Sequence, residues 1–160
     1  MKIILAAVGK KRGGPEAALV EDYLDRAKGF GRRIGFSDIG LVEVEAPKAL
    51  SGDVLKKREG ELLLAALPPG APLIALDERG ENLSSEKFAA LLAGHRDQGA
   101  GAAMFAIGGA DGHGEELRSR AARLVSFGAA TWPHMLVRAM LAEQLYRAMT
   151  ILSGHPYHRA

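Results

Sequence analysis

Two stretches toward the C-terminal end of the sequence carry side chains that can move protons or hold phosphates. In the first, His134 and Arg138 stand four residues apart, a spacing that places both on one face of a helix. A histidine exchanges a proton near neutral pH, and an arginine can hold a phosphate through two hydrogen bonds. The pair therefore indicates a functional site, and a plain solvated helix face is the alternative interpretation.

The second stretch, GHPYHR from Gly154 to Arg159, gathers side chains that stack on bases, transfer protons and bind phosphates. RNA contacts require such groups together. The sequence therefore predicts RNA binding by His155, Tyr157, His158 and Arg159. Two histidines without a nearby carboxylate are poor zinc ligands, so we expect no metal site.

Two segments rich in small residues lie upstream. The stretch IGGADGHG from Ile107 to Gly114 has four glycines in eight residues, more than a simple turn requires, and glycine lets a backbone approach a flat or anionic ligand closely. The stretch FGAATW from Phe127 to Trp132 is small and uncharged, which leaves backbone N–H and C=O groups free to face a ligand. A lone tryptophan is more often a core anchor than a platform for a base, so we expect Trp132 in the core.

Segments typical of strands and of helices alternate along the chain. Apolar or alternating runs predict strands at residues 2–8, 40–46, 72–76, 102–107 and 123–127. Capping residues and apolar periodicity predict helices at residues 15–28, between 51 and 68, after 84, at about 115–122 and at 133–152. This order indicates one α/β domain, residues 1–160, with a mostly parallel sheet and helices on both faces.

Ligands of such sheets bind beyond the carboxyl ends of the strands. The loops after Leu76, Ile107 and Phe127 are therefore the expected place of a site. The residues that follow Leu76, from Asp77 to Gly80, are mostly polar and predict a turn.

The last predicted helix is apolar around most of its circumference, and such a helix must be covered on several sides. One sheet covers one side. We therefore expect a second copy of the chain to cover another, which makes the protein a homodimer. Complete burial within one chain is the alternative.

The composition and the motifs exclude several kinds of site and several classes of protein. The chain has no cysteine, which rules out disulfides, zinc–thiolate sites and a cysteine nucleophile. No P-loop sequence occurs, and GKKRGG at residues 9–14 is not a dinucleotide fingerprint, although its three cations suit phosphates. No apolar run approaches the roughly 20 residues that cross a membrane, so we expect a cytoplasmic protein. The net charge is +4 over residues 1–33, −7 over 34–117 and +5 over 118–160, which favours a polyanionic partner.

Several motifs together resemble the SPOUT methyltransferases. They are the GGxxG loop after residues 102–107, the small-residue segment leading into TWPHMxxR, EQLYRA on the last helix, the ending HPYHR and the start MKIxxxAVGK. More specifically, they resemble the RlmH family of large-subunit rRNA pseudouridine-N3 methyltransferases, over essentially the whole chain.

The resemblance implies a fold and a cofactor. It implies a trefoil knot in the C-terminal half, a homodimer with its site near the subunit interface, and S-adenosylmethionine (S-adenosyl-L-methionine) bound between knot loops. Carried over by position, the cofactor contacts are Leu76, Gly108, Phe127, Gly128, Ala129, Ala130, Thr131 and Trp132. Relatives have another apolar residue at the last of these positions, so Trp132 is expected to keep the main-chain contacts and reshape the pocket wall.

The implied reaction is methylation of pseudouridine N3 in 23S rRNA on the assembled ribosome. N3 must lose a proton, for which we expect His134 or His158 as base, with Asp111 as a weaker alternative. Arg138 is expected to stabilise the developing charge, and Tyr157 and Arg159 to hold the nucleotide. The alternatives are a SPOUT methyltransferase of another base, such as one in tRNA, a catalytically silent RNA-binding or assembly factor, and a flavodoxin-like regulator.

Overall fold

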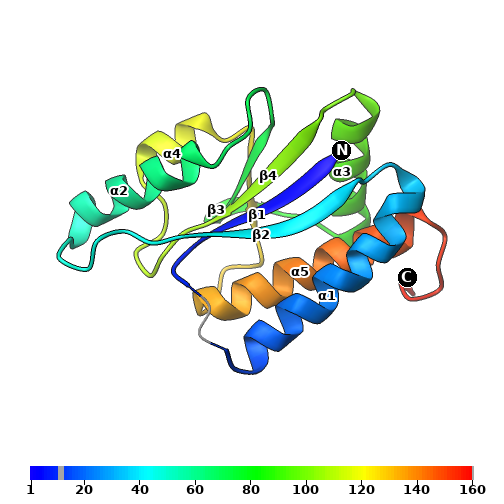
Figure 1. The fold of residues 1–160 in the computed structure, drawn as a ribbon, viewed down its shortest axis with the longest axis horizontal. Helices are drawn as coiled ribbons and strands as arrows, with labels where there is room; N and C mark the ends of the chain where they lie inside the picture. The colour runs from blue at the N-terminus through cyan, green and yellow to red at the C-terminus, as the bar shows by residue number, and fades with distance from the viewer. Residues whose placement is uncertain (11–12, 160) are drawn as a thin grey trace.

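The computed structural model describes residues 1–10 and 13–159, which build helices around a twisted sheet (Figure 1). In this part of the chain, five parallel strands form the sheet in the order β2-β1-β4-β3-β5. The strands are β1 (Lys2–Val8), β2 (Asp38–Val44), β3 (Leu73–Asn82), β4 (Ala102–Ile107) and β5 (Arg123–Ser126). The helices are α1 (Pro15–Gly31), α2 (Gly52–Ala65), α3 (Ser85–Asp97), α4 (Glu115–Arg120) and α5 (His134–Leu152), with a 3-10 helix at Arg32–Ile34.

The inner strands β1 and β4 are apolar on both faces because helices cover both faces of the sheet. Side chains alternate along a strand. Ile3 and Leu5 of β1 therefore pack in the cluster formed with α1, α3 and α5, whereas Ile4 packs in the cluster formed with α2 and α4. Figure 1 shows α1, α3 and α5 on one side of the sheet and α2 and α4 on the opposite side. The predicted α/β class, with a parallel sheet and helices on both faces, is confirmed.

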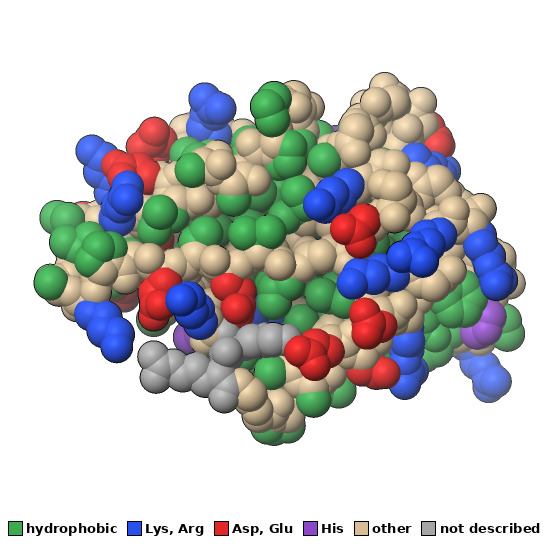
Figure 2. Space-filling view, in the orientation of Figure 1, with side chains coloured by type: hydrophobic (Ala, Val, Ile, Leu, Met, Phe, Trp, Pro, Cys, Tyr) green, Lys and Arg blue, Asp and Glu red, His purple; other side chains and the backbone are tan. Residues whose placement is uncertain are grey.

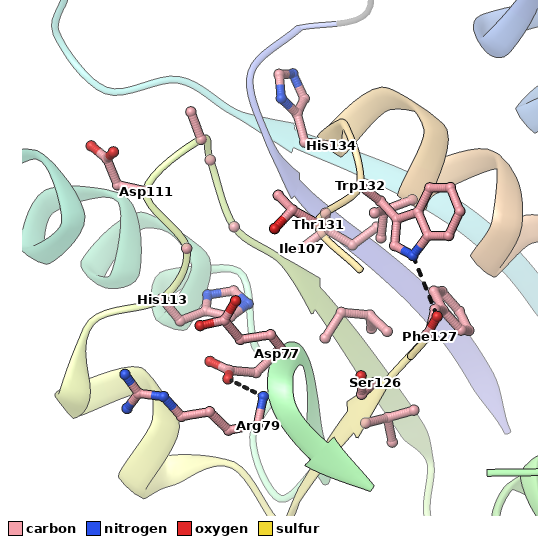
Figure 3. A pocket seen from close by; sticks show the side chains of 18 of the residues that line it. Asp77, Arg79, Ile107, Asp111, His113, Ser126, Phe127, Thr131, Trp132 and His134 are labelled. Carbon is pink, nitrogen blue, oxygen red and sulfur yellow. Dashed lines mark hydrogen bonds between the residues drawn. The ribbon is translucent and has the colours of Figure 1, made fainter. Parts of the chain in front are cut away.

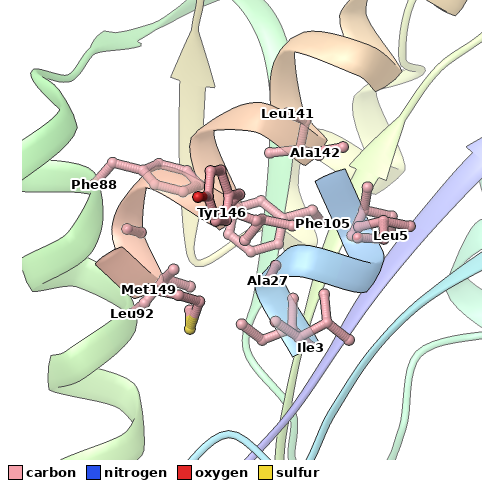
Figure 4. Close-up of a cluster of buried hydrophobic side chains, with 14 of the residues drawn as sticks. Ile3, Leu5, Ala27, Phe88, Leu92, Phe105, Leu141, Ala142, Tyr146 and Met149 are labelled. Carbon is pink, nitrogen blue, oxygen red and sulfur yellow. The ribbon is translucent and has the colours of Figure 1, made fainter. Parts of the chain in front are cut away.

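Helix α5 lies in the larger of the two clusters, against α1, α3 and β4 (Figure 4). Its Tyr146 contacts the ring of Phe30 with centroids 5.9 Å apart, and Phe105 of β4 packs 5.5 Å from Phe88 of α3. One chain therefore covers much of the apolar circumference of α5, although Leu136 and Met140 remain partly exposed.

The strand predictions at residues 2–8 and 102–107 are confirmed with the same bounds. The cap prediction at Ser84 is confirmed too, since its hydroxyl accepts a hydrogen bond from the Lys87 amide at 3.3 Å. The turn predicted at Asp77–Gly80 is wrong, because these residues continue β3.

The pairing of β3 with β5 shifts register between Leu76 and Glu81, so polar residues follow the buried part of the strand without ending it. Gly80 makes this possible. A Cβ at Gly80 would lie 2.5 Å from the backbone nitrogen of Val125, so only glycine lets the two strands approach this closely.

None of the helices in the described residues combines the length and apolar composition that a membrane crossing requires.

Candidate active site

A cavity of about 340 Å³ opens beyond the carboxyl ends of β4 and β5 and beside the middle of β3 (Figure 3). The predicted loops after Ile107 and Phe127 meet there with residues 76–79, which belong to β3 and do not form the predicted loop. Of the residues expected to contact a cofactor, all but Ala129 line the cavity: Leu76, Gly108, Phe127, Gly128, Ala130, Thr131 and Trp132. Three segments that are far apart in the sequence thus share one wall, as the strand order requires.

The glycine-rich loop after β4 folds back on itself. Gly112 donates its amide to the carbonyl of Gly109 at 3.1 Å and has φ +73°. A Cβ at Gly108 would lie 3.0 Å from the carbonyl carbon of Gly112. The density of glycine noticed in the sequence therefore has a physical cause: side chains would force apart the two sides of a loop that borders the cavity.

The segment after β5 is held by side chains at its two ends. The hydroxyl of Ser126 donates to the Gly128 carbonyl at 2.9 Å and accepts from the Gly128 amide at 3.1 Å. At the far end, Trp132 donates its indole N–H to the Phe127 carbonyl at 3.3 Å (Figure 3). Trp132 is 42% exposed, so the expectation that it anchors the core is wrong. It closes its own loop over the cavity instead.

Three polar side chains on the opposite wall were not predicted as site residues. The Asp77 carboxylate lies 3.6 Å from Nη1 of Arg118 in α4 and accepts the Arg79 amide at 3.0 Å. His113 is 4% exposed, with Nε2 3.3 Å from the Ala106 carbonyl. Burial lowers the pKa of His113, an effect that the Ala106 carbonyl partly offsets. The signal in the sequence was present: Asp77 directly follows a buried strand segment.

His134, the first residue of α5, lines the same cavity from the side of Trp132 (Figure 3). Partial burial, and then the positive charge of Arg138, lowers the pKa of His134. The neutral imidazole is therefore favoured, and a neutral imidazole can accept a proton. Asp111 stands across the cavity on the glycine-rich loop. The arrangement combines a backbone-lined pocket with a base at its rim.

A family model described as "Predicted SPOUT methyltransferase" matches residues 1–158. The chain belongs to the SPOUT methyltransferase family. Two similar curated proteins carry the name ribosomal RNA large subunit methyltransferase H. The one from Rhodospirillum centenum is 56% identical and the one from Rhodospirillum rubrum 53% identical, each over 100% of both chains. A solved structure of a probable methyltransferase from Bordetella pertussis Tohama I has the same fold, with a TM-score of 0.53 and 17% identity over 92% of this chain and 93% of that chain.

In this SPOUT methyltransferase, Arg138 does not line the cavity beside His134, so its predicted role at the reacting base is wrong. Its side chain is 1% exposed. It donates to Oε1 of Glu43 at 2.7 Å and to the carbonyls of Val8 and Gly9 at 2.5 and 2.6 Å. The four-residue spacing correctly places Arg138 one turn after His134, but its guanidinium turns inward to the ends of β1 and β2. Contact with RNA or a reacting base does not fit this position.

The tail of the SPOUT methyltransferase lies at the opposite end of α5 from the cavity. Nε2 of His158 lies 2.6 Å from a carboxylate oxygen of Glu86, while Nδ1 is 3.4 Å from Nη1 of Arg147. Arg147, beside His158, lies 13 residues after His134 on α5, which is about 20 Å along the helix axis. His134 and His158 of one chain are thus not brought together.

The other tail residues pack beside His158. The Tyr157 hydroxyl donates to Glu143 at 3.2 Å, and its ring lies 4.6 Å from that of Tyr146. Burial, and then the Glu143 charge, raises the pKa of Tyr157 to about 12. His155 meets Phe30 edge-on at 4.8 Å, and Arg159 is exposed. Glu143 also pairs with Arg147 at 2.5 Å, the ion pair that their spacing suggests.

Charges on the face shown in Figure 2 alternate in sign. Lys2 lies 3.9 Å from Asp38, and Lys10 lies 3.9 Å from Glu45. A surface of one sign does not form there. Lys11 and Arg12 of the predicted phosphate-binding stretch lie outside the described residues. No group of three or more histidine, cysteine or acidic side chains that could hold a metal occurs in residues 1–10 and 13–159.

Proposed function

We propose that this chain transfers a methyl group from S-adenosylmethionine to N3 of a pseudouridine in 23S rRNA, on the assembled ribosome. The family and the shared name of its relatives support the reaction class and the rRNA substrate. The observation that carries the proposal is the convergence of two predicted loops and the middle of β3 on one cavity with His134 at its rim. A cytoplasmic location and the trefoil knot are part of the same proposal.

The residues present fit the cofactor. A cavity of about 340 Å³ falls in the range of small-molecule sites, roughly 300–1,000 Å³. Its lining combines glycines and alanines with apolar side chains and a few polar ones, which suits recognition of an adenine edge by the backbone and of ribose hydroxyls by polar groups. The holding residues would be Leu76, Gly108 and the segment 127–132. When bound, S-adenosylmethionine supplies an electrophilic methyl group on a positively charged sulfur.

The chain's own contribution is alignment and removal of one proton. The imide N3 of pseudouridine is protonated at neutral pH, so it must lose its proton before or during attack on the methyl carbon. In the proposal His134 accepts that proton at its imidazole nitrogen, because its lowered pKa keeps it neutral. The glycine-rich loop and the segment 127–132 hold the methyl donor in line with N3, which is where most of the rate gain arises in such displacements.

A second copy of the chain completes the site in this proposal. His158 and its neighbours in the tail reach a cavity only if α5 of one copy runs antiparallel to α5 of the other. An apolar groove between α1, α5 and the start of α3 offers a surface for such a partner, and its wall includes Leu19, Leu136 and Met140. Leu19 is 43% exposed and shares this groove with Leu136 and Met140, and a contiguous exposed apolar patch of this kind is typical of an interface.

The test is mass mapping of modified nucleosides in rRNA from cells with and without the protein, followed by assays of purified protein. N3-methylated pseudouridine should disappear from 23S rRNA in the deletion strain and return with the wild-type gene. Purified protein should methylate 70S ribosomes in preference to free 23S rRNA or tRNA. Methylation of tRNA alone would favour another substrate, and no binding of labelled S-adenosylmethionine in equilibrium dialysis would favour a silent RNA-binding factor.

A further inference from the structure

Helix α2 presents a buried acid to the glycine-rich loop. Glu59 is 8% exposed, although it belongs to a surface helix. A Cβ at Gly109 would lie 2.9 Å from both carboxyl oxygens of Glu59. The carboxyl group therefore occupies the space that a side chain at position 109 would fill, and it rests against the backbone of the loop that borders the cavity.

Within the described residues, the Glu59 carboxyl forms no ion pair or hydrogen bond that would hold a negative charge. The cation on the same face of α2, Lys56, pairs with Asp53 at 3.6 Å. On the adjoining helix α4, Arg118 pairs with Asp77 and Glu115.

The charge that acts on Glu59 is negative. Burial, and then the charge of Asp111 on the glycine-rich loop, raises the pKa of Glu59. The charged side chain of β2 nearest the cavity end of the sheet, Glu43, is bound to Arg138 instead. Burial and the charge of Asp111 thus both act in the same direction, and they favour the protonated form of Glu59 more than in an exposed glutamate.

We propose that Glu59 is a positioning residue for the cofactor loop, holding Gly109 in place through its buried carboxyl group. A neutral carboxyl group keeps one O–H donor and can pack against backbone without a charge to solvate. An ionised Glu59 would repel Asp111 and move residues 108–112 away from α2. The proposal rests on the proposed function, because it assigns the loop to S-adenosylmethionine.

The first test compares Glu59→Gln and Glu59→Ala by equilibrium dialysis with labelled S-adenosylmethionine. Glutamine has the same shape and no charge, so its affinity should stay within about twofold of wild type, as for substitutions that remove no support. Alanine leaves the loop unsupported, and misplacement by about 1 Å can cost about 10²-fold. Glu61→Ala, on the same helix but at the surface beside Arg58, is the matched control and should bind like wild type.

The pH profile separates positioning from simple packing. Because the pKa of Glu59 is raised, the neutral form persists above the usual carboxyl range and is lost as pH rises through that raised value. Wild-type affinity for S-adenosylmethionine should therefore fall with rising pH, while Glu59→Gln should not follow that fall. Parallel profiles in the two proteins would overturn the role of the proton.

A double substitution tests the contact itself. Gly109→Ala alone should weaken binding, because the new methyl group meets the Glu59 carboxyl. Adding Glu59→Ala removes that obstacle, so the double variant should bind better than Gly109→Ala. Thermal unfolding of all variants shows whether the fold is kept, and additive effects of the two substitutions on binding would refute the contact.

The two proposals fail in different ways. If wild type binds S-adenosylmethionine and methylates 23S rRNA while Glu59→Ala binds equally well, the role of Glu59 is refuted and the function stands. If wild type binds the cofactor but leaves 23S rRNA unmodified, the proposed substrate is wrong and the Glu59 comparison still decides the role of the loop. If wild type binds no S-adenosylmethionine, both are overturned.

Discussion

The two ends of α5 carry a histidine each, and they are built in opposite ways. At the N-terminal end, His134 faces a cavity walled by backbone and small residues. At the C-terminal end, His158 is held between Glu86 and Arg147, and Tyr157 is bound to Glu143. Within the described residues, the His134 imidazole forms no hydrogen bond, whereas His158 and Tyr157 bond to side chains of α3 and α5.

This difference shows where a ligand is expected and where it is not. Buried polar groups normally find partners within the protein, and among the described residues the buried Nε of Arg118, which belongs to the cavity lining, has none. This cavity is therefore where a ligand is expected. The C-terminal cluster is already satisfied within one chain. Its side chains become available to a substrate only if a second copy brings them to the other cavity.

The largest expected effect concerns His134. His134→Gln removes the proposed base, so kcat should fall by about 10²–10⁴-fold, while affinity for S-adenosylmethionine stays near wild type. Since the pKa of His134 is lowered, the neutral base survives below its ordinary value of 6.5, and wild-type kcat should decline only below that pH. Single-turnover methylation of ribosomes across pH measures both. Unchanged turnover in His134→Gln and in His158→Ala would remove both histidines from the mechanism.

Substitution of Arg138 tests whether the N-terminal end of α5 depends on a buried charge for its stability. Arg138→Met removes a buried guanidinium that pairs with Glu43 and donates to the carbonyls of Val8 and Gly9, so unfolding in urea should show a loss of about 3–5 kcal/mol. Arg123→Met is the matched control, because Arg123 is 44% exposed and lies 3.6 Å from Glu81, and such surface pairs contribute about 0–1 kcal/mol. If Arg138→Met keeps full stability but loses methylation, Arg138 acts on the substrate and is not a structural residue.

Mixed dimers test whether the two ends of α5 meet between copies. In a dimer of one His134→Gln chain and one His158→Ala chain, one site keeps both histidines and the other keeps neither. Random mixing of the two inactive variants should therefore restore about a quarter of the wild-type rate, given a twofold dimer. No recovery, with mixed dimers verified by mass spectrometry, would mean that each copy works with its own tail or without it.

The smallest expected effect concerns Trp132. Because its backbone, not its indole, faces the cofactor in the proposed site, Trp132→Leu should change the affinity for S-adenosylmethionine by only about twofold, as exposed substitutions do. Isothermal titration measures this. A tenfold or larger loss would show that the indole ring itself is part of the pocket.

Much of the fold follows from the sequence because the inner strands are uninterrupted apolar runs with clear ends. Residues 2–8 and 102–107 have few alternatives to buried strands, and the strand-end rule then places the cavity. The polar residues 77–80 predict a turn, because polarity normally ends a strand, but they belong to β3. A backbone contact as close as that of Gly80 with Val125 depends on the neighbouring strand and leaves no local pattern.

The orientation of single side chains was the part that could not be predicted. Spacing along a helix places His134 and Arg138 on adjacent turns, but only tertiary packing decides that one faces the cavity and the other the sheet. Trp132 is similar, since its size favours the core and its loop keeps it outside. Buried acids such as Glu59 escape prediction because charged residues on a surface helix usually meet water.

The packing of α5 against α1 has a consequence for biosynthesis. The first helix and the last described helix share one apolar cluster, so Val20 and Leu24 have no cover while residues 134–152 are still inside the translating ribosome. The nascent chain therefore stays open on one side until residues 134–152 have left the ribosome. A truncated chain that lacks this helix exposes the apolar face of α1 to chaperones and proteases.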